Sequence, residues 1–209
     1  MTTALTKKNK STYTMSKRRR NGIIIGCLLL IVVFVWLDHK WQLQPSDFEK
    51  YHGKSSTVVK VIDGDTIDIA IPDGRYEQTR IRLWGVDAPG SKTEEYGPMY
   101  FGLQATEFTE KLTLGKTVTV YLDKDNRSRD KYGRLLAYVQ LPDGRFLNEV
   151  LIAEGFAYAD LRFRHSFYNK YKQLEASARS LKKGLWQKVK RDQLPEWLQK
   201  EKPNLLRKK

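Results

Sequence analysis

The chain has 209 residues, a length that suits one domain of ordinary size with extensions. Its net charge of +14 lies at the two ends: residues 1–21 hold seven Lys or Arg and no acid, residues 182–209 hold ten against three acids, and the centre is neutral. This distribution excludes a generally polycationic central domain, and the one cysteine, Cys27, excludes a disulfide within the chain.

The basic segment 1–21 precedes 16 uncharged residues, 22–37. A helix of that length spans about 24 Å, slightly less than the ~30 Å hydrocarbon core of a bilayer. A small-x-small cleavage site is missing after Leu37, which argues against a cleaved signal peptide. The uncharged run also has no polar face, which argues against a buried core helix. We therefore expect a single-pass signal anchor, with a cytoplasmic N-terminus and the following domain outside. In a eukaryote the same start could address an internal membrane.

The remaining chain reads as a linker (38–56), an α+β domain (57–186) and a basic tail (187–209) that is a surface arm or disordered. Alternating apolar residues and Gly or Pro turns favour a small closed barrel of five strands with three helices. The expected strands cover 57–71 with a break at Gly64, 76–86, 117–122, 135–141 and 145–147, and the expected helices cover 99–114, 149–154 and 168–182.

Three separated clusters carry candidate chemistry. Asp65 follows an Asp-Gly pair, Asp87 follows the second strand, and their hard oxygens suit Ca²⁺ or Mg²⁺. Arg82 and Arg134 each supply a planar guanidinium that can hold a phosphate through two hydrogen bonds. Taken singly, each cluster also fits a structural role, because Asp-Gly is common in β-turns and a loop ion pair is worth only ~0–1 kcal/mol.

The order and spacing of these clusters over residues 57–186 resemble the staphylococcal (thermo)nuclease family. That resemblance implies an OB-fold barrel with three helices, a Ca²⁺ cofactor, and hydrolysis of phosphodiester bonds in DNA or RNA. The motifs that carry it are Val61-Ile62-Asp63-Gly64-Asp65-Thr66, Arg82 with Val86-Asp87-Ala88-Pro89, Tyr96-Gly97-Pro98, Asp130-Lys131-Tyr132-Gly133-Arg134-Leu135-Leu136-Ala137-Tyr138, and Asn148-Glu149 with Gly155.

The resemblance assigns a role to each matching position. Asp65 and Asp87 match Ca²⁺ ligands, and Ala88 matches a residue that offers its backbone carbonyl to the metal. Arg82 and Arg134 match the two catalytic arginines that hold the phosphate.

The substrate-binding side chains follow from the same likeness. Tyr132 matches a tyrosine that lines the nucleotide site. Phe163 lies near the position at which the family has an aromatic residue packed against the nucleotide base. One position departs from the family: Gly90 stands where a Glu usually serves as general base. Glu94 is the substitute base that we expect, with Glu95 as the other candidate, and the third alternative is a metal-bound water that acts without a base.

These observations predict a membrane-anchored, monomeric, Ca²⁺-dependent nuclease whose metal-activated water attacks a phosphodiester. Another divalent cation could take the place of Ca²⁺. The alternative is a tethered OB-fold module that binds nucleic acid or protein without chemistry, and a plain envelope scaffold is a third possibility. Since general base catalysis contributes typically ~10²–10⁴-fold, the change at Gly90 predicts a weak enzyme rather than an inactive one.

Overall fold

The computed structural model describes residues 16–42, 45–91 and 98–206, and its contacts divide the chain into two units, 1–45 and 46–209. The first unit contains helix α1 (Lys17–Gln42), which includes the expected apolar segment. Among the described residues, no helix reaches the length and apolar character that crossing a bilayer requires. The uncharged run itself is short for that task, and the anchor at 22–37 stays a prediction.

The second unit is built on the expected five-stranded closed barrel, with the strand order β1-β2-β3-β6-β5. Neighbouring strands are antiparallel except β3 and β6, which run parallel. Two further strands form a small antiparallel sheet that sequence patterning did not predict. The barrel strands are β1 (Lys54–Asp63), β2 (Thr66–Ile69), β3 (Thr79–Leu83), β5 (Thr117–Tyr121) and β6 (Leu135–Gln140), and the small sheet pairs β4 (Val86–Asp87) with β7 (Tyr158–Ala159).

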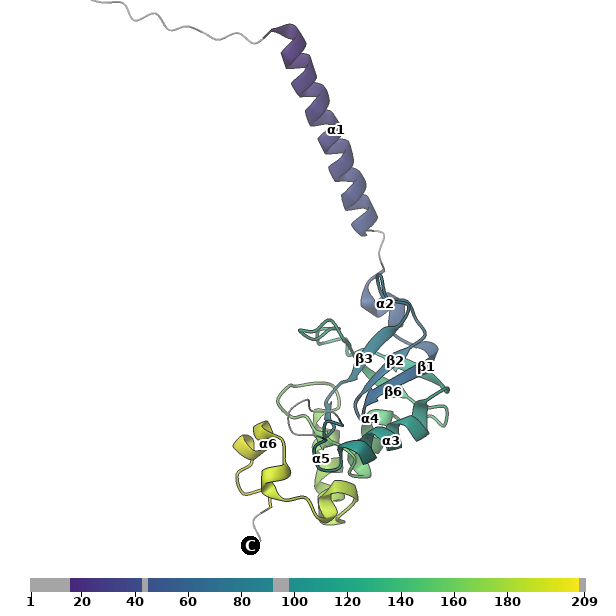
Figure 1. The fold of residues 1–209 in the computed structure, drawn as a ribbon, viewed down its shortest axis with the longest axis vertical. Helices are drawn as coiled ribbons and strands as arrows, with labels where there is room; N and C mark the ends of the chain where they lie inside the picture. Colours follow the sequence, from purple (N-terminus) through teal and green to yellow (C-terminus); the bar gives the residue numbers. More distant parts are fainter. Residues whose placement is uncertain (1–15, 43–44, 92–97, 207–209) are drawn as a thin grey trace, which may run out of the picture. The chain divides into compact units, whose positions relative to one another are not determined.

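Three of the helices in this unit are the ones that the sequence predicts, and they lie together on one side of the barrel (Figure 1). They are α3 (Gly102–Thr113), α4 (Leu147–Ala153) and α5 (Tyr168–Ser180). The strand expected at 145–147 is reduced to one bridge between Gln140 and Phe146, because α4 already begins there.

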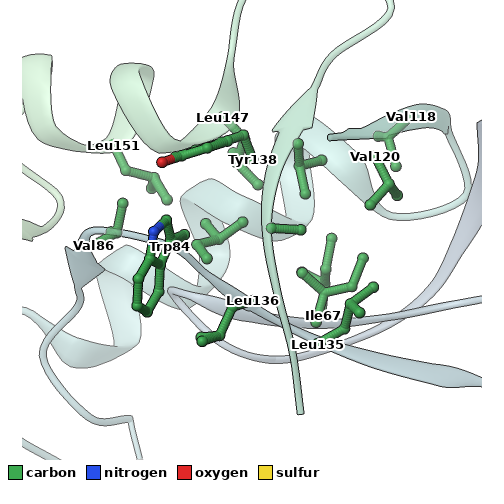
Figure 2. Packing of buried hydrophobic residues seen from close by; sticks show 14 of the residues in the cluster. Ile67, Trp84, Val86, Val118, Val120, Leu135, Leu136, Tyr138, Leu147 and Leu151 are labelled. Carbon is green, nitrogen blue, oxygen red and sulfur yellow. The ribbon is translucent and has the colours of Figure 1, made fainter. Parts of the chain in front are cut away.

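Alternation and helical spacing explain how the core forms. In β5, Val118 and Val120 point inward and are almost completely buried, as the two-residue period of a strand requires. In α3, Ala105 and Thr109 lie one turn apart on the buried face. Figure 2 shows how side chains of α4 and of the strands meet in the main hydrophobic cluster.

The segment expected as a linker contains helix α2 (Asp47–Tyr51), so the ordered unit begins earlier than predicted. Ser46 and Glu49 form a reciprocal capping box, with the backbone N–H of Ser46 donating to the Glu49 carboxylate at 2.9 Å. Tyr51 is fully buried in the main core, and its hydroxyl hydrogen-bonds Thr79 at 3.0 Å.

The C-terminal end of the chain, from residue 184 to residue 206, is folded, so of the two alternatives for the tail the disordered one does not hold. It contains two short 3₁₀ turns, Gly184–Gln187 and Arg191–Gln193, and helix α6 (Glu196–Glu201). Leu194 and Leu198 are buried in a second hydrophobic cluster with Leu185 and Trp186.

Candidate active site

The first carboxylate of the site, Asp65, lies in the tight turn between β1 and β2. Gly64 is required there, because a Cβ on it would lie 2.7 Å from the Cβ of Ala88 and 2.9 Å from that of Ala105. Asp65 is buried, and it accepts the Thr66 hydroxyl at 3.0 Å and the backbone N–H of Ala88 at 2.6 Å. The carboxylate is therefore held in one orientation by neighbours on two sides.

Arg82, at the end of β3, joins this carboxylate to the second one. One guanidinium nitrogen, Nη1, contacts Asp65 Oδ2, and the other, Nη2, donates to Asp87 Oδ1 at 2.9 Å. Burial lowers the pKa of Arg82, while the charges of Asp87 and Asp63 oppose that shift. Three candidate residues from two separate motifs thus meet at one point.

The second oxygen of Asp87 accepts a hydrogen bond that the sequence did not predict. It comes from the indole Nε1 of Trp197 in α6, at 2.7 Å, across 110 positions of the chain. The only available sign was an aromatic residue in a basic tail, which does not identify a partner.

Arg134, at the start of β6, forms the loop ion pair that was the structural alternative, with its Nε donating to Asp130 at 2.7 Å. The other carboxylate oxygen of Asp130 accepts the backbone N–H groups of Tyr132 and Arg134, which shapes the loop. The Arg134 guanidinium lies 5.3 Å from the centre of the exposed Tyr132 ring. A planar cation beside an exposed aromatic ring suits a nucleotide, whose base can stack while its phosphate is bound.

Arg82 and Arg134 line the same pocket, which has a volume of about 430 Å³. Tyr132 and Phe163 also line this pocket, with the Phe163 ring stacked 6.2 Å from that of Trp84. Basic side chains outnumber acids in this lining, a charge balance that favours an anionic ligand. The charged residues of the lining are Arg82, Arg127, Lys131, Arg134 and Arg162 against Asp130 and Asp160.

The oxygen donors of the site have the chemistry that a divalent cation requires. Asp65 and Asp87 converge on one positively charged group, so the same carboxylates could neutralise a metal ion. In the described ranges no cluster of three or more acidic, His or Cys side chains could hold a metal, so further ligands would be backbone carbonyls and water. The carbonyl role of Ala88 stays a prediction.

The position of the general base is only partly described. Glu94 and Glu95 lie outside the described residues. Gly90 is described, and the nearest atom that a Cβ on it would meet is the Met99 sulfur, at 3.8 Å. Within the described residues, which leave out 92–97, no backbone strain or close contact requires glycine at this position.

Comparison of the sequence with known proteins identifies a family. A sequence model described as "Staphylococcal nuclease homologue" matches residues 80–188. The chain belongs to the staphylococcal nuclease family.

Several relatives in the staphylococcal nuclease family align over most of this chain. The thermonuclease of Staphylococcus hyicus is 31% identical over 172 residues, covering 81% of this chain and 98% of that protein. The thermonuclease of Staphylococcus intermedius is 36% identical over 145 residues, covering 69% and 82%. An Escherichia coli protein named as an uncharacterized endonuclease is 33% identical over 174 residues, covering 80% and 93%.

Proposed function

We propose that this protein is a nuclease that hydrolyses phosphodiester bonds of DNA, RNA or both with the help of a divalent cation, preferably Ca²⁺. The observation that carries the proposal is the meeting of Asp65, Arg82 and Asp87 next to the pocket that Arg82 shares with Arg134. The names of the relatives, thermonuclease and endonuclease, support the same activity.

Asp65 and Asp87 would hold the cation, and a bound cation would lower the pKa of a water molecule and polarise the phosphate. Arg82 contacts both carboxylates, and its single positive charge balances one of their two negative charges. With a cation balancing the charge of the two carboxylates, the Arg82 guanidinium would be free to bind a phosphate oxygen inside the pocket. Arg134 binds the same phosphate, and the two arginines stabilise the charge that grows in the transition state.

The aromatic residues of the pocket bind the substrate. The Tyr132 ring is 71% exposed and Phe163 is 47% exposed, so both rings present a free surface. Stacking of a base on an aromatic ring contributes about 1–3 kcal/mol and tolerates any base sequence. In this proposal Glu94 removes the proton from the attacking water.

The decisive experiment is a cleavage assay of the full-length protein on single-stranded DNA and RNA oligonucleotides, with Ca²⁺ titrated from zero. We expect cleavage that depends on Ca²⁺ and stops with EDTA. Arg82→Ala should lose at least about 10²-fold in rate. Comparison of Glu94→Gln with Glu95→Gln identifies the general base, since only the variant that has lost the base should lose activity. Absence of cleavage by the wild type with Ca²⁺, Mg²⁺ and Mn²⁺ would reject the proposal.

Gly90 favours one other candidate function, a binding module that lost its chemistry. Such a module would bind oligonucleotides with a strong salt dependence, and EDTA would not change the affinity. Binding without cleavage in the same assay would select this alternative.

We also propose that residues 22–37 anchor the protein in a membrane, with residues 1–21 in the cytoplasm and the nuclease unit, as a monomer, on the other side. The support is the charge asymmetry of the sequence and the exposed apolar side chains of α1, such as Ile23 and Phe34. Extraction of membranes with alkaline carbonate should leave the protein in the pellet, and protease added to sealed spheroplasts should degrade the nuclease unit. Release by carbonate would reject the anchor.

A further inference from the structure

The C-terminal helix contributes a side chain to the acidic pair. Trp197 of α6 donates its indole N–H to Asp87 Oδ2 at 2.7 Å, and Arg82 donates to Asp87 Oδ1 at 2.9 Å. Each carboxylate oxygen of Asp87 thus accepts a hydrogen bond from one donor, and the two donors, Arg82 and Trp197, lie far apart in the sequence. Each oxygen can accept two hydrogen bonds or ligand contacts, so each keeps one site for a cation.

Trp197 is itself held firmly in place. The Arg162 guanidinium lies 4.6 Å from the centre of the indole ring and is paired with Asp160 through hydrogen bonds of 2.7 and 2.8 Å. The next residue, Leu198, is fully buried, and Lys202 after the helix bonds to the buried Glu175 at 3.2 Å. Arg162 therefore packs on the indole, and Leu198 and Lys202 hold in place the helix that carries it.

We propose that Trp197 is a positioning residue that orients Asp87 for the divalent cation. The inference rests on the proposed function. Side chains that hydrogen-bond a metal-binding carboxylate fix its orientation, and their loss typically weakens metal affinity about 10–100-fold. The family match ends at residue 188, so this contact comes from chain beyond the matched region.

The test compares Trp197→Phe with Trp186→Phe in the full-length protein. Phe keeps an aromatic ring beside Arg162 but lacks the N–H. Trp186 is a suitable control because it is buried and its indole nitrogen finds no hydrogen-bond partner within the part of the chain that the structure describes. Calorimetry with Ca²⁺ alone should show about 10–100-fold weaker binding for Trp197→Phe and no change for Trp186→Phe.

The kinetic readout separates positioning from general damage. For Trp197→Phe, the Ca²⁺ concentration for half-maximal cleavage should rise by the same factor, while kcat at saturating Ca²⁺ changes little. In the Asp87→Asn background, Trp197→Phe should cause no additional loss of Ca²⁺ affinity, because the residue acts through Asp87. Additive losses in this cycle would show a structural effect on the fold and overturn the inference.

Two further outcomes are informative. If Trp197→Phe binds Ca²⁺ as tightly as the wild type or more tightly, the indole does not position Asp87, and tighter binding would mean that it blocks the site. If the wild type itself binds no Ca²⁺, the metal-dependent function fails and the inference fails with it. The first outcome leaves the proposed function intact, so the two failures are distinguishable.

Discussion

The backbone N–H of Ala88 donates a hydrogen bond of 2.6 Å to the carboxylate of Asp65. This bond ties the end of β4 to the turn between β1 and β2, two segments separated by the whole of β2 and β3. The carboxylate therefore depends on main-chain geometry for its orientation, and the side chain at position 88 matters mainly through its size against Gly64.

Asp65→Asn should remove the charge of this carboxylate while keeping its shape. Asn can still accept the Ala88 N–H, so we expect a folded protein with Ca²⁺-dependent cleavage reduced at least about 10²-fold. Asp68→Asn is the matched control, because Asp68 is an equally buried acid three residues further on, in β2, whose carboxylate pairs with Arg80. Equal activity losses in the two variants, measured at saturating Ca²⁺, would contradict the role of Asp65.

Gly90→Glu should raise the cleavage rate. Among the described residues the nearest atom to an added Cβ is the Met99 sulfur at 3.8 Å, and the family resemblance implies a Glu at this position. A positioned general base contributes typically about 10²–10⁴-fold, and we expect a gain toward the lower end because the surrounding loop differs. In a Glu94→Gln background, which lacks the proposed base, Gly90→Glu should restore the rate and the acidic limb of the pH profile of kcat, and Gly90→Gln should restore neither.

Arg134→Ala should weaken both binding and chemistry. The guanidinium lines the pocket and lies beside Tyr132, so its loss removes a phosphate contact and one of the two cations beside that ring, the other being Lys131. We expect a fall of about 10²–10³-fold in kcat/KM for oligonucleotides. Arg145→Ala is the control: it breaks an exposed ion pair with Asp143, and kinetics should stay within twofold of wild type.

Asp123→Asn should destabilise the protein in a pH-dependent way. Burial alone would raise the pKa of Asp123, but hydrogen bonds from the Ser166 N–H and the Tyr138 hydroxyl outweigh it and lower the pKa to about 2. A lowered folded-state pKa stabilises the fold above the unfolded value of 3.8, and this contribution is lost as the pH falls toward 2.

Urea unfolding of Asp123→Asn at several pH values tests this linkage. At pH 7 the variant should be less stable by about 1–3 kcal/mol, and the difference from wild type should shrink between pH 4 and pH 2. Asp143→Asn, at an exposed turn, should stay within about 0.5 kcal/mol of the wild type. A constant difference across the whole pH range would show that the charge of Asp123 is not responsible.

Much of the barrel could be predicted from the sequence, because its strands alternate apolar and polar residues around Gly turns. The meeting of Asp65, Arg82 and Asp87 also follows, once β2 and β3 pair as a hairpin. The direct ion pair between Arg82 and both acids did not follow, since it depends on burial that only the closed barrel creates.

Other features lacked a readable signal or were overlooked. The two-residue strands β4 and β7 are too short for any periodicity, and Trp197 reaches Asp87 only through tertiary packing. Helix α2 had a usable signal, since Ser46-x-x-Glu49 is a capping-box sequence. The segment nevertheless resembles a linker in composition, because it is short, polar and follows Pro45.

Arg129 bonds Asp47 of α2 and Asp73 of the hairpin at 2.7–3.0 Å, and it sits on the loop that leads to Arg134. A recombinant version trimmed to the region of family resemblance, starting at residue 57, would lack Asp47 and the buried Tyr51. Protein prepared for crystallisation or calorimetry should therefore start no later than Ser46, or a loosened loop will be mistaken for an intrinsically poor enzyme.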